Sequence, residues 1–250
     1  MPRARDEGEQ SCSDQSGHSL IELLIAMTVG LIVFAAAVQG LSHLRGEFAE
    51  QQDLAARQQD ARIGLAVMAS ELGAAGVGLQ LIGQPLLTAA VDEVSFYANL
   101  SGLSTHLTRH SAADETVLHV ESGTGWRKGK RVFVCDESRC LQGRLARNGR
   151  RGELTLLHRL EAGFPKGSLV MRVNHVRYYL RGGGKDLLRL MRMVDGGAST
   201  LVDEVATMRL SYFGSEGRTA LDPATIADVR IDLTLKRKTT PIRRVISVRI

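Results

Sequence analysis

The feature that most constrains this sequence is one long apolar stretch near its start. From Leu23 to Leu44 the chain runs for 22 residues without Asp, Glu, Lys or Arg. A bilayer core about 30 Å thick needs about 20 helical residues to cross it, whereas the apolar core of a secretory signal has about 7–15 residues and precedes a small-residue cleavage site. Here the apolar run passes into a polar helical pattern at Glu47 and Phe48. We therefore predict one retained membrane-spanning helix.

The remaining chain has the composition of a folded, water-exposed domain. Of its 250 residues, 44% are hydrophobic and 24% are charged, which excludes wholesale disorder. A mean hydropathy of -0.05 excludes a polytopic membrane protein. A later stretch without charges, residues 72–91, is interrupted by Pro85 and several glycines, unlike the first. The sequence thus predicts a single-pass protein with one or two domains outside the bilayer.

The residues around the start of the apolar stretch form a recognisable string. Gly17 to Met27, read as GHSLIELLIAM, resembles the cleavage and methylation motif of type IV prepilins. The resemblance implies that residues 1–17 are a leader, that a prepilin peptidase cleaves after Gly17, and that the new amino terminus, His18, is N-methylated. It also places Glu22 at the fifth position of the mature chain, as the motif requires. The family's usual residue at the position of His18 is Phe.

Glu22 is a lone carboxylate at the start of an apolar helix. A charge inside a spanning segment costs about 2.5–3.5 kcal/mol on insertion scales and usually signals a partner. Near the helix N-terminus the dipole favours it even without one. We hypothesise that Glu22 meets the positive amino terminus of a neighbouring subunit when such helices pack together, because an unpaired buried charge is expensive.

The membrane-spanning helix is predicted over residues 18–44. Beyond the membrane, the same helix is predicted to continue through residues 45–78. Its apolar residues recur on one helical face, and glycines from Gly73 onward end it. Residues 56–76 resemble the second half of the long helix in PilW-like minor pilins. The face consists of Leu54, Ala61, Leu65, Met68 and Leu72.

From about residue 90 the hydrophobic period becomes that of β-strands. Asn148-Gly149 predicts a tight hairpin turn, and Gly182 to Gly184 predicts another. The order of segments 178–180, 201–205 and 210–213 and a final alternating pair resembles PilW-like pilins and the J-type pseudopilins of type II secretion. We therefore expect an α+β, type IV pilin-like fold, with a long N-terminal helix packed on a β-rich head over residues 79–250. The predicted strands are 94–97, 116–120, 131–135, 141–147, 153–158, 169–180, 187–194, 229–235 and 245–250.

Cysteine usage points to an oxidising compartment. Cys12 lies in the expected leader, and Cys135 and Cys140 remain with four residues between them. A zinc site would need a second Cys or His pair at suitable spacing, which the neighbouring sequence does not provide. Two free thiols are the other alternative. A local disulfide is favoured over both in a periplasm.

Two basic clusters make nucleic-acid binding the rival class of function. A basic patch attracts phosphate, but no aromatic residue interleaves with either cluster, and aromatic side chains provide the stacking that single strands prefer. We therefore favour solvated turns or contacts to acidic partner pilins. The clusters are Arg144, Arg147, Arg150 and Arg151, and, near the C-terminus, Lys236, Arg237, Lys238, Arg243 and Arg244.

The sequence does not predict an enzyme, and it predicts neither a bound metal ion nor a cofactor. The sequence has no P-loop, no G-x-S-x-G and no H-E-x-x-H. The adjacent acidic pairs Asp92-Glu93 and Asp203-Glu204 would point to opposite faces of a strand, so neither is a ready acid–base dyad.

The resemblance implies a structural minor pilin in the inner membrane, with its N-terminus cytoplasmic and its head periplasmic. Such a subunit would help initiate type IV pilus assembly with other minor and major pilins and the inner-membrane assembly platform, and would stay at the pilus tip. The alternatives are a J-type pseudopilin of a type II secretion system and a DNA-binding minor pilin of an uptake pilus.

Overall fold

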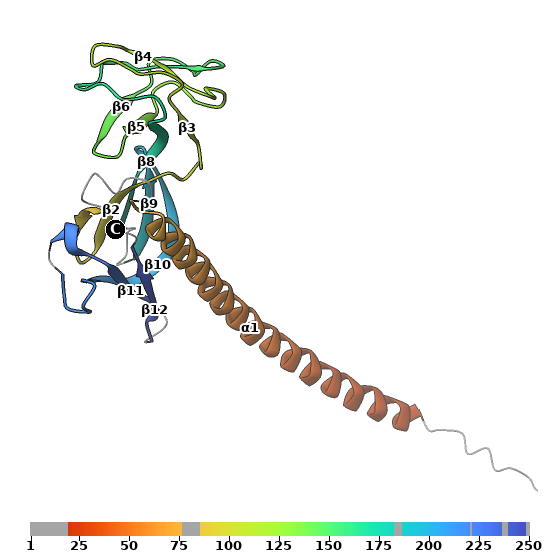
Figure 1. The fold of residues 1–250 in the computed structure, drawn as a ribbon. Helices are drawn as coiled ribbons and strands as arrows, with labels where there is room; N and C mark the ends of the chain where they lie inside the picture. Colours follow the sequence, from red (N-terminus) through yellow and green to blue (C-terminus); the bar gives the residue numbers. More distant parts are fainter. Residues whose placement is uncertain (1–19, 77–85, 183–186, 221, 237–239, 249–250) are drawn as a thin grey trace, which may run out of the picture. The chain divides into compact units, whose positions relative to one another are not determined.

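A computed structural model describes residues 20–76, 86–182, 187–220, 222–236 and 240–248. It contains one long helix, α1 (Leu20–Gly73), followed by antiparallel strands (Figure 1). This confirms the α+β, pilin-like fold class expected from the sequence. Residue contacts divide the chain into two units, residues 1–56 and residues 57–250, which we describe separately.

The first unit contains the apolar part of α1. Its large apolar side chains are exposed on every side of the helix, with exposed fractions from 48% at Val38 to 79% at Leu20. A helix that is apolar all round requires an apolar environment. By length and composition, α1 can cross a membrane, as the sequence predicts.

The second unit begins with the last turns of α1, which bury one face. Ala61, Leu65, Met68 and Leu72 are fully buried, at the positions that the helical period predicts. Gly64 lies on the same face and lets the helix approach β10 closely, because a Cβ there would lie 2.5 Å from Cγ2 of Val202. The helix ends at Gly73, five residues before the predicted end at residue 78.

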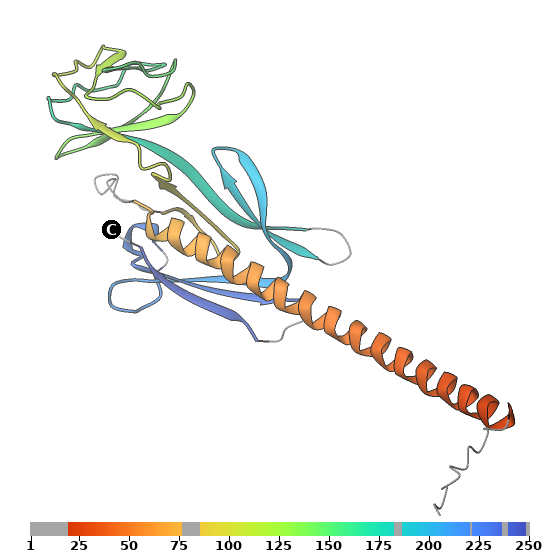
Figure 2. The same ribbon diagram turned by 90° about the vertical axis from the view of Figure 1, so that its right-hand side faces the viewer.

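The buried face of α1 packs against a large antiparallel sheet (Figure 2). Regular strands with alternating burial build it, as in β11, where every second residue is buried. The strands follow the order β1 (Leu86–Ala89), β2 (Glu93–Ala98), β8 (Leu169–Gly182), β9 (Leu188–Val194), β10 (Gly197–Phe213), β11 (Asp228–Leu235) and β12 (Ile242–Ser247).

A small lobe occupies residues 99–168 and has a core of its own. The fully buried residues of that core include Leu118 and Leu154, and Trp126 is 2% exposed. The lobe joins the large sheet through β8: Leu169 to Val173 pair with β3 and β5, and Asn174 to Gly182 pair with β2 and β9. Its strands are β3 (Ser104–His106), β4 (Val117–His119), β5 (Arg131–Cys135), β6 (Cys140–Arg144) and β7 (Glu153–Thr155).

Two details differ from the sequence prediction. The hairpin turn expected at Asn148-Gly149 lies three residues later, at Arg151-Gly152, where Gly152 has φ +88° and Arg150 and Glu153 exchange backbone hydrogen bonds. Asn148 is used elsewhere: its Oδ1 accepts from the N–H of Lys128 at 2.8 Å. The last strand, predicted over 245–250, is β12 at Ile242–Ser247.

Candidate functional site: the amino-terminal segment and the head surface

Glu22 lies in the first turn of α1. The exposed backbone N–H groups of a helix N-terminus favour a carboxylate at this position. The residues that follow, from Leu23 onward, are apolar and exposed, so the charge stands at the end of the segment that needs an apolar environment. The proposed cleavage and methylation residues, Gly17 and His18, lie outside the described residues.

The other end of α1 is fixed to the head by a partly buried polar cluster. The Glu71 carboxylate accepts a 2.5 Å hydrogen bond from the Tyr178 hydroxyl on β8. The same carboxylate accepts from Nε of Arg192 on β9 at 2.9 Å and forms an ion pair with that guanidinium. The exposed fractions of the Glu71 and Arg192 side chains are 13% and 27%. Burial and the adjacent Glu71 raise the pKa of Tyr178 well above its usual value.

Sequence reasoning missed this cluster. Glu71 and Arg192 are 121 residues apart in the chain, so no local pattern connects them. The one available signal is that Glu71 interrupts an otherwise apolar face beside Leu72. In the structure, Glu71 connects the end of α1 to Tyr178 on β8 and to Arg192 on β9.

The first basic cluster lies in the small lobe. Arg144, Arg147, Arg150 and Arg151 are all exposed. Arg147 also donates a 2.8 Å hydrogen bond from Nε to the Thr155 hydroxyl. These side chains are therefore accessible to a partner, and the aromatic interactions that the structure records involve none of the four.

The second basic cluster lies at the end of β11 and on β12. Lys236 is exposed, whereas Arg237 and Lys238 fall outside the described residues. Arg243 donates from Nε to Oδ1 of Asp232 at 2.7 Å. Arg244 is exposed. The two clusters thus belong to different parts of the head, one to the small lobe and one to the far edge of the large sheet.

Cys135 and Cys140 are joined by a disulfide across the β5–β6 hairpin. Within the turn, Oδ1 of Asp136 accepts hydrogen bonds from the backbone N–H groups of Ser138 and Arg139 and from the Ser138 hydroxyl. These hydrogen bonds lower the pKa of Asp136. Across the described part of the chain, no group of three or more His, Cys, Asp or Glu side chains could hold a metal ion.

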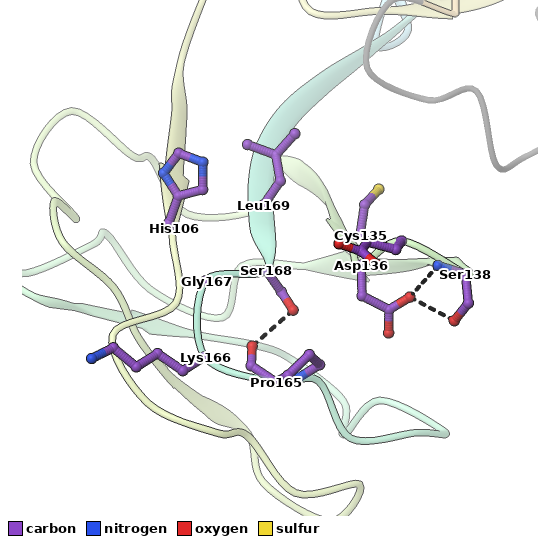
Figure 3. A pocket seen from close by; sticks show the side chains of 10 residues that line it. His106, Cys135, Asp136, Ser138, Pro165, Lys166, Gly167, Ser168 and Leu169 are labelled. Atoms are coloured by element: carbon purple, nitrogen blue, oxygen red, sulfur yellow. Dashed lines mark hydrogen bonds between the residues drawn. The ribbon is translucent and has the colours of Figure 1, made fainter.

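A surface cavity of about 640 Å³ lies beside this turn (Figure 3). His106 and Lys166 line it together with Asp136, Glu137 and Ser138. Two of its polar groups have protein partners: the Ser168 hydroxyl donates to the Pro165 carbonyl at 2.8 Å, and Asp136 is held by the turn.

Three of the four carboxylates in the two acidic pairs, Glu93, Asp203 and Glu204, are held by arginines. Glu93 forms a two-point hydrogen-bonded pair with Arg177, at 2.8 and 2.7 Å. Asp203 pairs with Arg189 at 3.1 Å, and Glu204 pairs with Arg57 of α1. Each of these three carboxylates thus serves to connect strands or to hold the helix.

Comparison with known proteins agrees with the amino-terminal motif. Residues 12–38 match the family model described as the prokaryotic N-terminal methylation motif. No curated protein and no solved structure matches the chain. The matched residues include Gly17, His18 and Glu22, and they run into the apolar part of α1.

The motif, the spanning helix and the antiparallel head together support a type IV pilin-like protein. More particularly, they indicate a pilin or pseudopilin of a type IV pilus or secretion system, anchored in the inner membrane by the one helix, among the residues that the structure describes, that can span it. Proteins with this motif are structural subunits, are processed by prepilin peptidase and have other pilins as partners.

Proposed function

We propose that the protein is a minor pilin, PilW-like, that helps initiate type IV pilus assembly in a priming complex and remains at the pilus tip. The observation that carries the proposal is the prepilin motif at residues 12–38, which runs into a helix that can span a membrane and that is followed by a β-rich head. Its partners would be other minor and major pilins, prepilin peptidase and the inner-membrane assembly platform.

In this proposal the chain divides by function as well as by structure. Residues 1–17 are the leader, residues 18–44 span the membrane with the N-terminus cytoplasmic, residues 45–78 extend the helix, and residues 79–250 form the periplasmic head. Gly17 is the cleavage residue, His18 becomes the methylated terminus, and Glu22 contacts a neighbouring subunit. The position of Glu22 in the first turn of α1 supports its role in subunit contact, because the carboxylate lies close to the new amino terminus in sequence.

The first test is the intact mass and N-terminal sequence of the membrane-extracted protein, with and without prepilin peptidase. We expect a chain that begins at His18, lacks the 17-residue leader and carries one methyl group. A chain that still begins at Met1 in the presence of the peptidase would overturn the assignment to this class.

A second test separates the pilus from the secretion system. We expect deletion of the gene to abolish surface pili, and expression of the wild-type chain to restore them. Glu22→Ala should be cleaved normally but should not restore pili, because the buried amino terminus of its neighbour then lacks a counter-charge. Loss of protein secretion with normal pili would favour the J-type pseudopilin instead.

A further inference from the structure

The large sheet has two edges, and the described residues cover only one of them. At the β1 edge the sheet curls back on itself: the N–H of Leu210 on β10 donates to the Val91 carbonyl at 2.7 Å, and the Tyr212 hydroxyl donates to the Ala90 carbonyl at 2.7 Å. β1 also packs against the short helix η2 (Pro223–Thr225). At the other edge, β12 pairs with β11 on one side, and no described strand pairs with its other side.

Backbone direction shows which groups β12 presents at that open side. In an antiparallel ladder, successive residues direct their N–H and C=O groups to opposite sides. The N–H of Val248 donates inward to the Ala227 carbonyl, and the N–H of Lys236, which directly follows β11, donates away from β12 to the Glu204 carbonyl. Given the register Val229↔Ile246, both hydrogen bonds indicate that the even-numbered residues of β12 direct their backbone N–H and C=O groups toward β11. Arg243, Val245 and Ser247 therefore direct their backbone N–H and C=O groups outward.

The open edge has the regularity that strand pairing requires. The six residues of β12 pair with β11 without a register shift, and Pro241 precedes the strand, so neither a bulge nor a proline interrupts it. Exposed strand edges are usually blunted by such features or by charge, because an open edge is a template for another chain. On β12 the only one of these protective features is charge. The Val245 side chain is apolar and 59% exposed.

That charge is all of one sign. β12 contains Arg243 and Arg244 and no acidic residue, and exposed Lys236 follows the neighbouring strand. Arg243 already pairs with Asp232 of β11 at 2.7 Å, and a guanidinium with five N–H donors can bind a second carboxylate. Arg243 and Arg244 are consecutive, so they lie on opposite faces of the sheet. Like charges facing each other across strands destabilise a pair, and opposite charges stabilise it. A second copy of this basic edge would therefore be a poor partner, and a strand with a carboxylate on each face would be a good one.

We propose that the outer edge of β12 binds a β-strand of a second protein, and that the incoming strand carries acidic side chains at consecutive positions. Backbone hydrogen bonds to Arg243, Val245 and Ser247 extend the sheet by one strand, and the two arginines select an acidic partner. The proposal concerns the head surface and stands independently of the proposed role in pilus assembly.

The probe is a fluorescently labelled eight-residue peptide of Val and Thr with Glu at two consecutive central positions, and the matched peptide has Lys at both. Each is titrated into the detergent-solubilised full chain, with anisotropy as the readout. We expect the Glu peptide to bind and the Lys peptide to bind at least about tenfold more weakly. Arg244→Glu should abolish that preference, because each peptide then meets one like and one opposite charge at the edge.

Val245→Pro tests the backbone contact. Proline removes an N–H group that faces outward, so the β11–β12 ladder loses no hydrogen bond. We expect this variant to fold and to bind the Glu peptide at least about tenfold more weakly, whereas Val245→Ala should bind within about threefold of the wild type. Ile246→Pro is the comparator for folding: it removes an inward N–H, so its midpoint of unfolding should fall while that of Val245→Pro changes little.

Hydrogen exchange locates the peptide. Binding should slow amide exchange at residues 243, 245 and 247. The proposal is overturned if the Glu peptide does not bind, if Val245→Pro binds it as the wild type does, or if both peptides bind equally. It is likewise overturned if protection appears elsewhere on the head and is absent from β12.

Discussion

The two parts of α1 have the same secondary structure and opposite surfaces. Residues 20–48 expose large apolar side chains all round, whereas residues 61–72 bury a narrow face of Ala61, Leu65, Met68 and Leu72. The first pattern requires a surrounding apolar medium and the second requires a protein partner on one side. One continuous helix therefore satisfies two environments, and the change of pattern marks where the head begins.

The largest expected effect distinguishes these two environments directly. Leu65→Ala removes a fully buried side chain between α1 and the sheet, and should lower the free energy of unfolding of the head by about 2–5 kcal/mol. Leu31→Ala, in the exposed apolar part, should leave it unchanged within about 0.5 kcal/mol. Chemical denaturation of the detergent-solubilised chain, followed by Trp126 fluorescence, measures both. Equal losses in the two variants would contradict the division of the helix.

The next effect concerns the polar attachment of the helix. Glu71→Gln keeps the side-chain volume but leaves the Arg192 guanidinium without its counter-charge in a largely buried place. We expect a loss of about 2 kcal/mol in the free energy of unfolding. Glu216→Gln is the matched control, since Glu216 and Arg218 form an exposed pair whose loss should cost less than about 0.5 kcal/mol. A loss for Glu71→Gln no larger than the control would show that packing alone fixes the helix.

Glycine substitution sharpens the comparison further, because α1 has glycines in both parts. A Cβ at Gly46 meets nothing within 4 Å, whereas one at Gly64 would press on Val202 of β10. Gly46→Ala should leave head stability unchanged. Gly64→Ala should lower it by about 1–2 kcal/mol, since overpacking outweighs the gain of about 1 kcal/mol in helix propensity. The same denaturation measurement applies, and a stabilised Gly64→Ala variant would show that β10 yields to the added methyl group.

Sequence reasoning succeeded where the pattern is local and periodic. It predicted the span from an unbroken apolar run, the buried helix face from its spacing, and the strand Arg131–Cys135 with its observed ends. It misplaced the turn near Asn148 because that side chain binds Lys128, a contact with another loop. It shifted the last strand because Arg243 and Arg244 conceal the start of β12.

Features that depend on contacts between distant parts of the chain could not be predicted from the sequence. The Glu71 cluster depends on two strands that follow more than 100 residues later. The path of β8 through both the large sheet and the small lobe depends on which strands pair with each half. The curling of the sheet, which covers the β1 edge and leaves the β12 edge open, likewise follows from contacts between β10 and the residues after β1.

The last effect is a dependence on alkaline pH, to which two buried tyrosines contribute. Burial, mainly, raises the pKa of both Tyr178 and Tyr212 well above the value of about 10 found in unfolded chains. Both hydroxyls therefore stay protonated in the folded protein while the unfolded chain loses their protons above pH 10. Their contribution to stability is fully present below pH 10 and is lost as the pH rises above it, by about 1.4 kcal/mol per pH unit for each tyrosine.

Tyr178→Phe isolates the share that belongs to the helix contact. The substitution costs stability at neutral pH because Glu71 loses a hydrogen bond, but above pH 10 the slope of stability against pH should fall to about half. Urea denaturation at several values between pH 9 and 11 measures the slopes. An unaltered slope in Tyr178→Phe would mean that the Tyr178 hydroxyl loses its proton as readily in the folded protein as in the unfolded chain. The contact between α1 and β8 would then not exclude water.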